Sequence, residues 1–233
     1  MVFCGCSGGK SKNGYSIGVD PTWYPLEVAG REKNVLGFSV ELLQEISKRQ
    51  KLNLTIVQMN WDNLLEGLKG KKYQAILSAL PPYAFYGQEY TFSETYLMTG
   101  PVIVTPLDSK IDSLESLKDK EVGVMRRSAA LELVQKVPGV VVREFDSVPE
   151  ALNALENGHI QCALIDSLVA KSYVRDLFAT KLKVTSTPLI DEGLRLITLF
   201  DMSPKLIEKF NKGLEEMKTS GAYTTLLQKW SLN

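Results

Sequence analysis

Three carboxylates and two indole rings are the side chains best suited to bind a small cation. Asp20, Glu27 and Asp166 could each pair with an ammonium or guanidinium group, whose burial without a partner is strongly unfavourable. Trp23 and Trp61 could stack on the faces of a guanidinium, a contact worth ~0.5–2 kcal/mol. Together these side chains predict a pocket for a cationic or zwitterionic small molecule.

Each of these residues also has an ordinary structural interpretation. Aromatic side chains most often pack in a core, so both interpretations stay open for Trp23 and Trp61. Asp20 precedes a proline and could instead form a turn. Asp166 lies between a predicted strand and a predicted helix and could cap that helix, although we favour ligand binding there.

A zwitterion also needs a partner for its carboxylate. Ser128 opens a predicted helix, whose first N–H groups are free to bind an anion. The neighbouring Arg127 could add a charge-assisted hydrogen bond. The loop at 125–130 therefore predicts the anion-binding side of the pocket.

The bulk composition argues against several other functions. Lys and Arg number 27, as do Asp and Glu, and this balance is not typical of a nucleic-acid-binding protein. One His and three Cys make a structural zinc site a poor interpretation. The chain has no G-x-S-x-G, phosphate-loop or H-E-x-x-H motif, and no apolar run long enough to span a bilayer. We therefore expect no cofactor, no metal and no enzymatic activity.

The first residues resemble the end of a bacterial lipoprotein signal. Apolar residues and Gly5 precede Cys6, which small polar residues follow, so Cys6 is the predicted lipidated residue. The alternative is an unstructured cloning remnant. In either case we expect residues 1–13 to be a flexible tether, and the lipoprotein interpretation predicts a periplasmic or cell-envelope location.

Strands and helices alternate along the rest of the chain, which is typical of an α/β protein. Predicted strands lie at 15–19, 54–57, 75–77, 121–125, 140–145, 163–165 and 194–199, with helices between them, the first from Ser39, and helices at 203–219 and 223–230 at the end. Segments around Pro101–Pro106 and Pro188–Gly193 could cross between two units. We therefore expect a discontinuous first lobe at 14–103 plus 195–233 and a second lobe at 104–194.

Several segments, taken in order, resemble the polar amino-acid binding proteins of ABC transporters, solute-binding protein family 3. They include Ile17-Gly18-Val19-Asp20, Leu36-Gly37-Phe38-Ser39, Tyr73-Gln74-Ala75-Ile76-Leu77-Ser78, Tyr90-Thr91-Phe92-Ser93 and the stretch 151–166. The resemblance covers nearly all of residues 15–230. It implies the type II periplasmic-binding-protein fold, with two lobes, each a mostly parallel sheet flanked by helices, joined by a two-stranded hinge.

The resemblance also implies which residues contact the ligand. Asp166 matches the partner of the ligand α-ammonium, and Asp20 matches an acidic side-chain partner found in members that bind basic amino acids. The remaining positions that it implies are Trp23 and Trp61 as pocket walls, Ser78, Ala79 and Leu80 at a strand end, and Met125, Arg127 and Ser128 in the second-lobe loop.

Two positions depart from the family pattern. Tyr86 stands where an Arg usually clamps the ligand carboxylate, and Pro81 stands where Ser or Thr is usual. Residues 50–125 contain no Arg at all, so Arg127 in the opposite lobe is one candidate to take over the carboxylate, and the tyrosines around Tyr86 are another.

The resemblance and the residues together predict a monomeric receptor that binds L-arginine or another basic amino acid and delivers it to an ABC permease. Two alternatives stay open, a small dehydratase-like enzyme and a sensor domain on the same fold.

Overall fold

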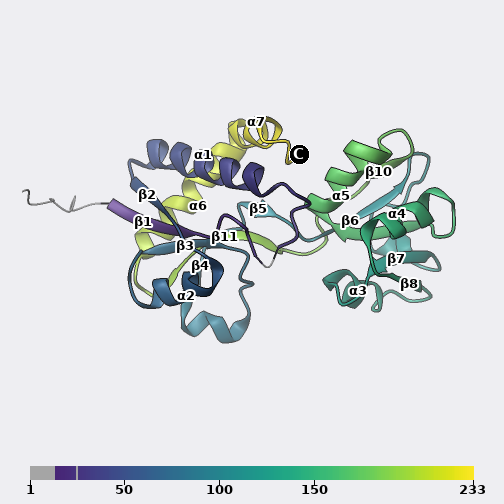
Figure 1. Cartoon of the computed structure of the whole chain (residues 1–233), viewed down its shortest axis with the longest axis horizontal. Helices are drawn as coiled ribbons and strands as arrows, with labels where there is room; N and C mark the ends of the chain where they lie inside the picture. Colours follow the sequence, from purple (N-terminus) through teal and green to yellow (C-terminus); the bar gives the residue numbers. More distant parts are fainter. Residues whose placement is uncertain (1–13, 25) are drawn as a thin grey trace, which may run out of the picture.

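The computed structural model describes residues 14–24 and 26–233. The predicted tether at 1–13, with Cys6, lies outside the described residues. Figure 1 shows two bodies, each a sheet with helices against it, joined where the chain passes between them.

The first sheet has the strand order β2-β1-β3-β11-β4, and β5 also pairs with β11. Its strands are β1 (Gly14–Val19), β2 (Asn53–Gln58), β3 (Ala75–Ser78), β4 (Tyr90–Phe92), β5 (Leu97–Met98) and β11 (Gly193–Leu199). β11 is antiparallel to β3, β4 and β5, whereas β1, β2 and β3 are parallel. The carboxyl ends of β1 and β3 therefore meet at one edge.

Helices cover both faces of the first sheet. They are α1 (Glu32–Gln50), α2 (Trp61–Lys69), α6 (Pro204–Thr219) and α7 (Ala222–Lys229), and a 3₁₀ turn, η1 (Ala84–Gln88), precedes β4. The apolar stripe of α1, with Phe38 and Leu42, packs with Phe210 of α6 over Ile17 of β1. On the other face, α2 packs Leu64 onto Ile76 and Ile197. Alternate residues of the strands thus point into two separate cores.

The second sheet has the strand order β10-β6-β9-β7-β8. Its strands are β6 (Pro101–Pro106), β7 (Glu121–Met125), β8 (Val141–Phe145), β9 (Cys162–Asp166) and β10 (Leu182–Val184). Its helical segments are η2 (Glu115–Leu117), α3 (Ala129–Val134), α4 (Val148–Glu156), α5 (Ser167–Tyr173) and η3 (Val174–Phe178). β7, β8 and β9 are parallel, and β6 is antiparallel to its neighbours β9 and β10. Three strand ends therefore face the same side.

Two segments connect the bodies, at 99–100 and at 185–192, and they lie against each other. The N–H groups of Thr99 and Gly100 donate to the Glu192 carbonyl at 2.8 and 3.3 Å, and the Leu189 N–H donates to the Pro101 carbonyl at 2.9 Å. The predicted fold class, two α/β lobes with a two-stranded connection, is confirmed. The sheets are mixed rather than mostly parallel, because β11 in the first and β6 in the second run antiparallel to their neighbours. The lobe boundaries at 103/104 and 194/195 stay a prediction.

The start of α1 differs from the prediction. The helix begins at Glu32, seven residues before the predicted start at Ser39. Gly37 lies inside the helix with the ring of Trp230 packed against it, and a Cβ there would lie 2.1 Å from the ring. The glycine provides room for a close contact rather than a helix end.

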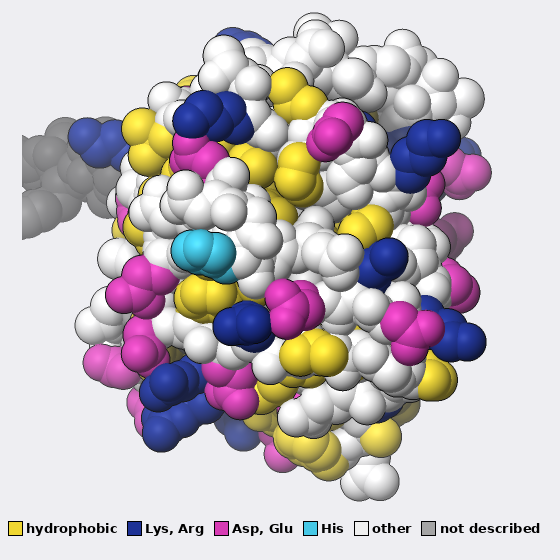
Figure 2. Space-filling view, turned by 90° about the vertical axis from the view of Figure 1, so that its right-hand side faces the viewer, with side chains coloured by type: hydrophobic (Ala, Val, Ile, Leu, Met, Phe, Trp, Pro, Cys, Tyr) yellow, Lys and Arg dark blue, Asp and Glu magenta, His cyan; other side chains and the backbone are white. Residues whose placement is uncertain are grey.

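None of the described helices is both long enough and apolar enough to cross a bilayer. Figure 2 shows positive and negative side chains interspersed over the outer face of the second lobe, without a large patch of one sign on that face. The single histidine, His159, is exposed there in a turn after α4.

Candidate functional site

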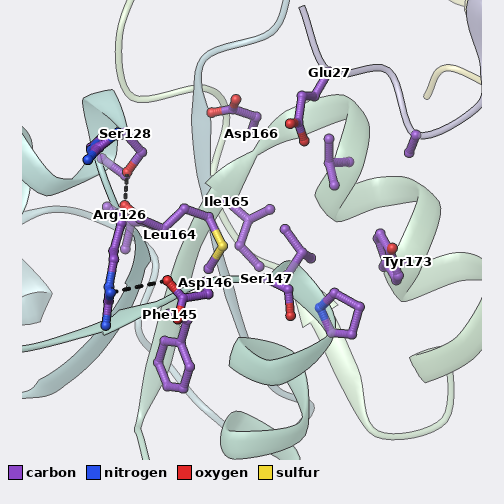
Figure 3. A pocket seen from close by; sticks show the side chains of 17 residues that line it. Glu27, Arg126, Ser128, Phe145, Asp146, Ser147, Leu164, Ile165, Asp166 and Tyr173 are labelled. Carbon is purple, nitrogen blue, oxygen red and sulfur yellow. Dashed lines mark hydrogen bonds and ion pairs between the residues drawn. The ribbon is translucent and has the colours of Figure 1, made fainter.

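A cavity of about 540 Å³ lies at the carboxyl ends of β7, β8 and β9 (Figure 3). Met125, Phe145 and Asp166 are the last residues of these strands, and all three line it. Glu27 reaches the same cavity from the first lobe. The position follows from the topology, because parallel strands of open α/β sheets gather their carboxyl ends, where ligands usually bind.

Asp166 is the most perturbed acid of this cavity. It ends β9 and precedes α5, but its side chain makes no capping hydrogen bond. Solvent reaches the side chain through the open cavity while protein surrounds its other sides. Burial raises the pKa of Asp166 to about 6, and the Glu192 and Glu27 carboxylates raise it further. In Figure 3 Asp166 and Glu27 lie at the same end of the cavity, and neither forms a salt bridge among the described residues.

The loop after β7 forms another wall of the cavity. The Ser128 hydroxyl caps α3 by accepting from the Leu131 N–H at 3.3 Å, and it donates to the Met125 carbonyl at 2.7 Å. Arg127 lines the cavity with a left-handed backbone, φ 56°. Arg126 pairs with Asp146 at 3.3 Å. Met125, Arg127, Ser128, Asp166 and Glu27 are thus brought together, as the sequence predicted.

Asp20 and Trp23 lie elsewhere in this structure, in the interior of the first lobe. Asp20 follows β1 and is 3% exposed; its Oδ1 accepts from the Thr22 N–H and hydroxyl at 2.9 and 2.8 Å, but its Oδ2 has no hydrogen-bond partner among the described residues. Trp23 packs in the core under α1 and donates its indole N–H to the Glu32 carbonyl at 3.2 Å. Neither residue lines the cavity, and their roles as ligand contacts stay predictions.

Trp61 and Tyr86 belong to aromatic groups of the first lobe that the cavity does not include. Trp61 begins α2 and packs edge-on against Tyr24, with 5.6 Å between ring centroids. Tyr86 contacts Phe85 and Tyr90, with centroids 4.3 and 5.9 Å away. Phe85 is exposed, so this group presents ring faces to solvent.

The predicted strand-end residues lie at a second, smaller cavity of about 170 Å³. Ala79 lines it, whereas Ser78 and Leu80 are buried beside it, with the Leu80 N–H donating to the Ser78 hydroxyl at 3.1 Å. Leu26 and Glu192 also line it. Leu26 precedes Glu27 of the larger cavity, and the Glu192 carboxylate raises the pKa of Asp166 there, so the two cavities are neighbours.

Sequence reasoning missed a residue of this second cavity, Arg195 on β11. It is 6% exposed and pairs with Asp191 at 2.5 Å. A signal was available, because Arg195 is the one charged residue in a mostly apolar strand, and a charged side chain is almost never buried without a partner.

Comparison with known proteins identifies the fold and the family. The family described as bacterial extracellular solute-binding proteins, family 3, matches residues 15–233. The arginine-binding extracellular protein ArtP of Bacillus subtilis is 27% identical over 236 residues, covering 99% of this chain and 92% of ArtP. A probable histidine-binding protein of Campylobacter jejuni is 27% identical over 221 residues, covering 93% of this chain and 84% of that protein.

A solved structure has the same fold. The unliganded, open L-cystine solute receptor of Neisseria gonorrhoeae superposes with a TM-score of 0.74 at 19% identity, covering 94% of this chain and 93% of the receptor. This likeness confirms the predicted type II binding-protein fold.

The family match covers nearly the whole described chain, and its members are binding proteins for transport that work outside the cytoplasm. The cavity at the strand ends fits that role, because it offers charged side chains without a catalytic arrangement. The chain belongs to the bacterial extracellular solute-binding proteins of family 3 and is therefore an amino-acid-binding component of an ABC transporter rather than an enzyme.

Proposed function

We propose that this chain binds L-arginine, or more weakly another basic amino acid such as lysine, in the cleft between its lobes and delivers it to a membrane permease. The observation that supports this most directly is unbalanced negative charge at the cleft. Glu27, Asp166 and Glu192 form no salt bridge among the described residues. Two of them raise the pKa of the third, Asp166. A cation would relieve that repulsion.

The buried Asp20 carboxylate supports a ligand with a second positive charge. Its Oδ2 is an acceptor without a partner, and a buried unsatisfied acceptor costs roughly 1–3 kcal/mol. β1 is hydrogen-bonded to β3, so Asp20 lies near the strand end that carries Ala79. A guanidinium suits such a place better than an ammonium, since it stacks on rings and can form two parallel hydrogen bonds with a carboxylate.

The relatives support the amino-acid class more strongly than the particular amino acid. ArtP is named for arginine, whereas the Campylobacter protein is named for histidine. Arginine is preferred here because of the acids of this chain, not because of one relative.

The proposed contacts assign one role to each side of the ligand. Asp166 pairs with the α-ammonium, and Asp20 or Glu27 pairs with the side-chain cation. The other proposed contacts are the rings of Trp23, Trp61 and Tyr86, the strand end at Ser78, Ala79 and Leu80, and the loop residues Met125, Arg127 and Ser128.

Binding is proposed to close the two lobes about the connecting segments, as a hinge. The moving bodies are 14–103 plus 195–233 and 104–194, and the protein acts as a monomer. A lipid on Cys6 would anchor it at the membrane next to the permease.

Substitution of Asp20 tests the cationic ligand. Asp20→Asn keeps an oxygen for the two Thr22 hydrogen bonds and removes the charge and the unpaired acceptor. Isothermal titration calorimetry should show the affinity for L-arginine falling by about tenfold or more, which is ~1.4 kcal/mol. The preference for arginine over lysine should fall with it.

The matched control is Asp108→Asn, an exposed acid that lines neither cavity described above. Its arginine affinity should equal that of the unaltered protein. Unchanged arginine affinity in Asp20→Asn would remove Asp20 from the site.

A further inference from the structure

A buried guanidinium faces the small cavity beside the connecting segments. Arg195 is 6% exposed and lines this cavity of about 170 Å³ together with Ala79, Thr99 and Glu192. Burying a positive charge at a cavity wall is costly unless anions compensate it. The partners of Arg195 therefore indicate what the cavity can accept.

The guanidinium is held in place but not saturated. One Nη1–H donates to the Ser93 carbonyl at 2.9 Å, and Nη2 donates to the Asp191 carbonyl at 3.3 Å and to its carboxylate at 2.5 Å. An Arg side chain has five N–H donors. The Nε–H and the second Nη1–H make no hydrogen bond among the described residues, so the group retains donors for another acceptor.

The position of Arg195 fits one end of a zwitterion. Arg195 is in register with Ser78, directly before Ala79 at the carboxyl end of β3. Glu192 lines the same cavity and is close enough to Asp166 to raise its pKa. A fixed cation and the free carboxylate of Asp166 thus lie at two neighbouring cavities, one in each lobe.

We propose that Arg195 binds the α-carboxylate of the amino-acid ligand from the first lobe while Asp166 binds the α-ammonium from the second. This rests on the proposed function in taking an amino acid as the ligand, and it does not depend on which side chain that amino acid carries. Arg195 then supplies the carboxylate contact in a chain that has Tyr86 at the first-lobe position where an arginine is usual in the family.

Asp191 holds the same guanidinium from its solvent-exposed side. Its side chain is 66% exposed and also accepts from the Thr95 hydroxyl at 2.5 Å, so it stays solvated and hydrogen-bonded if Arg195 shifts toward a ligand. Solvent screens the Asp191 side of this pair, whereas a carboxylate enclosed in the cavity would meet a less screened charge.

Two other assignments must be separated from this one. Arg127 of the second lobe also lines the cleft and could hold the carboxylate. Arg195 could instead have a purely structural role, joining β11 to Ser93 and Asp191. The first alternative changes which residue recognises the carboxylate, and the second predicts no recognition by Arg195.

Amino acids and their decarboxylated amines distinguish these cases. Calorimetry would compare L-arginine with agmatine, L-lysine with cadaverine and L-histidine with histamine, on the full chain and on the variants Arg195→Gln and Arg127→Gln. The variant Arg143→Gln, which removes an exposed pair with Glu121, is the control. The amino acid that binds the unaltered protein most tightly, together with its amine, would then be compared across the variants.

The proposal expects the unaltered protein to prefer the amino acid over its amine, and Arg195→Gln to reduce this preference by about ten- to a hundredfold, with amine affinity nearly unchanged. Retained amine binding would also show that the variant is folded. Equal losses for both ligands, or a collapse of the preference in Arg127→Gln only, would overturn the proposal. If the protein bound glutamine but none of the three cationic amino acids, only the proposal of a cationic ligand would be contradicted. The role of Arg195 would then be tested with L-glutamine and its decarboxylated amine, 4-aminobutanamide.

Discussion

Asp166 is placed so that its charge is unfavourable until a ligand arrives. It ends a strand, makes no capping hydrogen bond and has two other carboxylates nearby. In the absence of a cation, burial and then these two carboxylates oppose ionisation of its side chain and raise its pKa. The same features would favour an ammonium group, which would pair with Asp166 and reduce its repulsion from Glu27. Stability of the empty protein and affinity for its ligand are thus opposed at this residue.

This opposition can be measured with Asp166→Asn. Because the pKa is about 6 in the folded protein and 3.8 normally, the folded state holds a proton that the unfolded chain releases, so stability falls as pH rises from about 4 to 6. The variant should melt higher than the unaltered protein at pH 7.5, by up to about 2–4 °C, since solvent limits the effect to roughly 1 kcal/mol. The gain should vanish near pH 4.

Ligand affinity should change in the opposite direction. Asp166→Asn should bind L-arginine at least about tenfold more weakly at pH 7.5, because it loses the ammonium partner. A variant that melts no higher at pH 7.5 yet binds arginine normally would contradict both roles of Asp166.

The sequence predicted this cavity only in part. Asp166, Glu27, Arg127 and Ser128 were predicted and lie together, because strand ends and helix caps have local signals. Arg195 was missed, since its importance depends on β11 pairing with β3, a contact between distant parts of the chain. Such pairing cannot be read from local patterns.

At the scale of elements, Trp230 joins the end of α7 to α1 of the first lobe. The ring of Trp230 after α7 lies against Gly37 of α1, and the Trp230 indole N–H donates to Glu41 of the same helix at 3.1 Å. Asn34 donates to the Trp230 carbonyl at 2.9 Å. The first turns of α1 are therefore stabilised by the end of the chain.

Gly37→Ala tests this contact. A methyl group at 2.1 Å from the ring overpacks the contact and should lower the free energy of unfolding by about 1–3 kcal/mol in chemical denaturation. In a Trp230→Ala background the same change should instead stabilise by up to about 1 kcal/mol, because alanine favours helix. Gly87→Ala, which meets no atom within 4 Å, should be nearly neutral. The same sign for Gly37→Ala in both backgrounds would exclude the contact.

Local sequence signals explain which elements were predicted well. The seven predicted strands, which correspond to β1, β2, β3, β7, β8, β9 and β11, and the helices at 204–219 and 222–229 agree with the structure within one or two residues, because their apolar periodicity and flanking Ser, Pro and Gly are local signals. The short strands β4, β5 and β10 were not predicted. The predicted start of α1 was wrong because a glycine can either end a helix or make room for a close contact. Only the position of Trp230, far along the chain, shows that Gly37 makes room for a contact. β6 was taken for a connecting segment, since prolines bound it; they lie at its two ends, where a strand accepts them.

At the scale of the whole molecule, two sheets present their strand ends toward the connecting segments, and charged groups of both lobes gather there. Asp166 comes from the second lobe, and Glu27 comes from the first. Asp20, at the end of β1, adds a buried acid with an unpaired oxygen. The central claim is that this arrangement selects an amino acid with a positively charged side chain.

Competition calorimetry tests that claim most directly. The full chain at pH 7.5 would be saturated with L-glutamine, which lacks the side-chain charge, or with L-lysine, and then titrated with L-arginine. The account predicts that arginine displaces both, with an affinity at least about tenfold above either, equal to ~1.4 kcal/mol. Glutamine binding as tightly as arginine would contradict it.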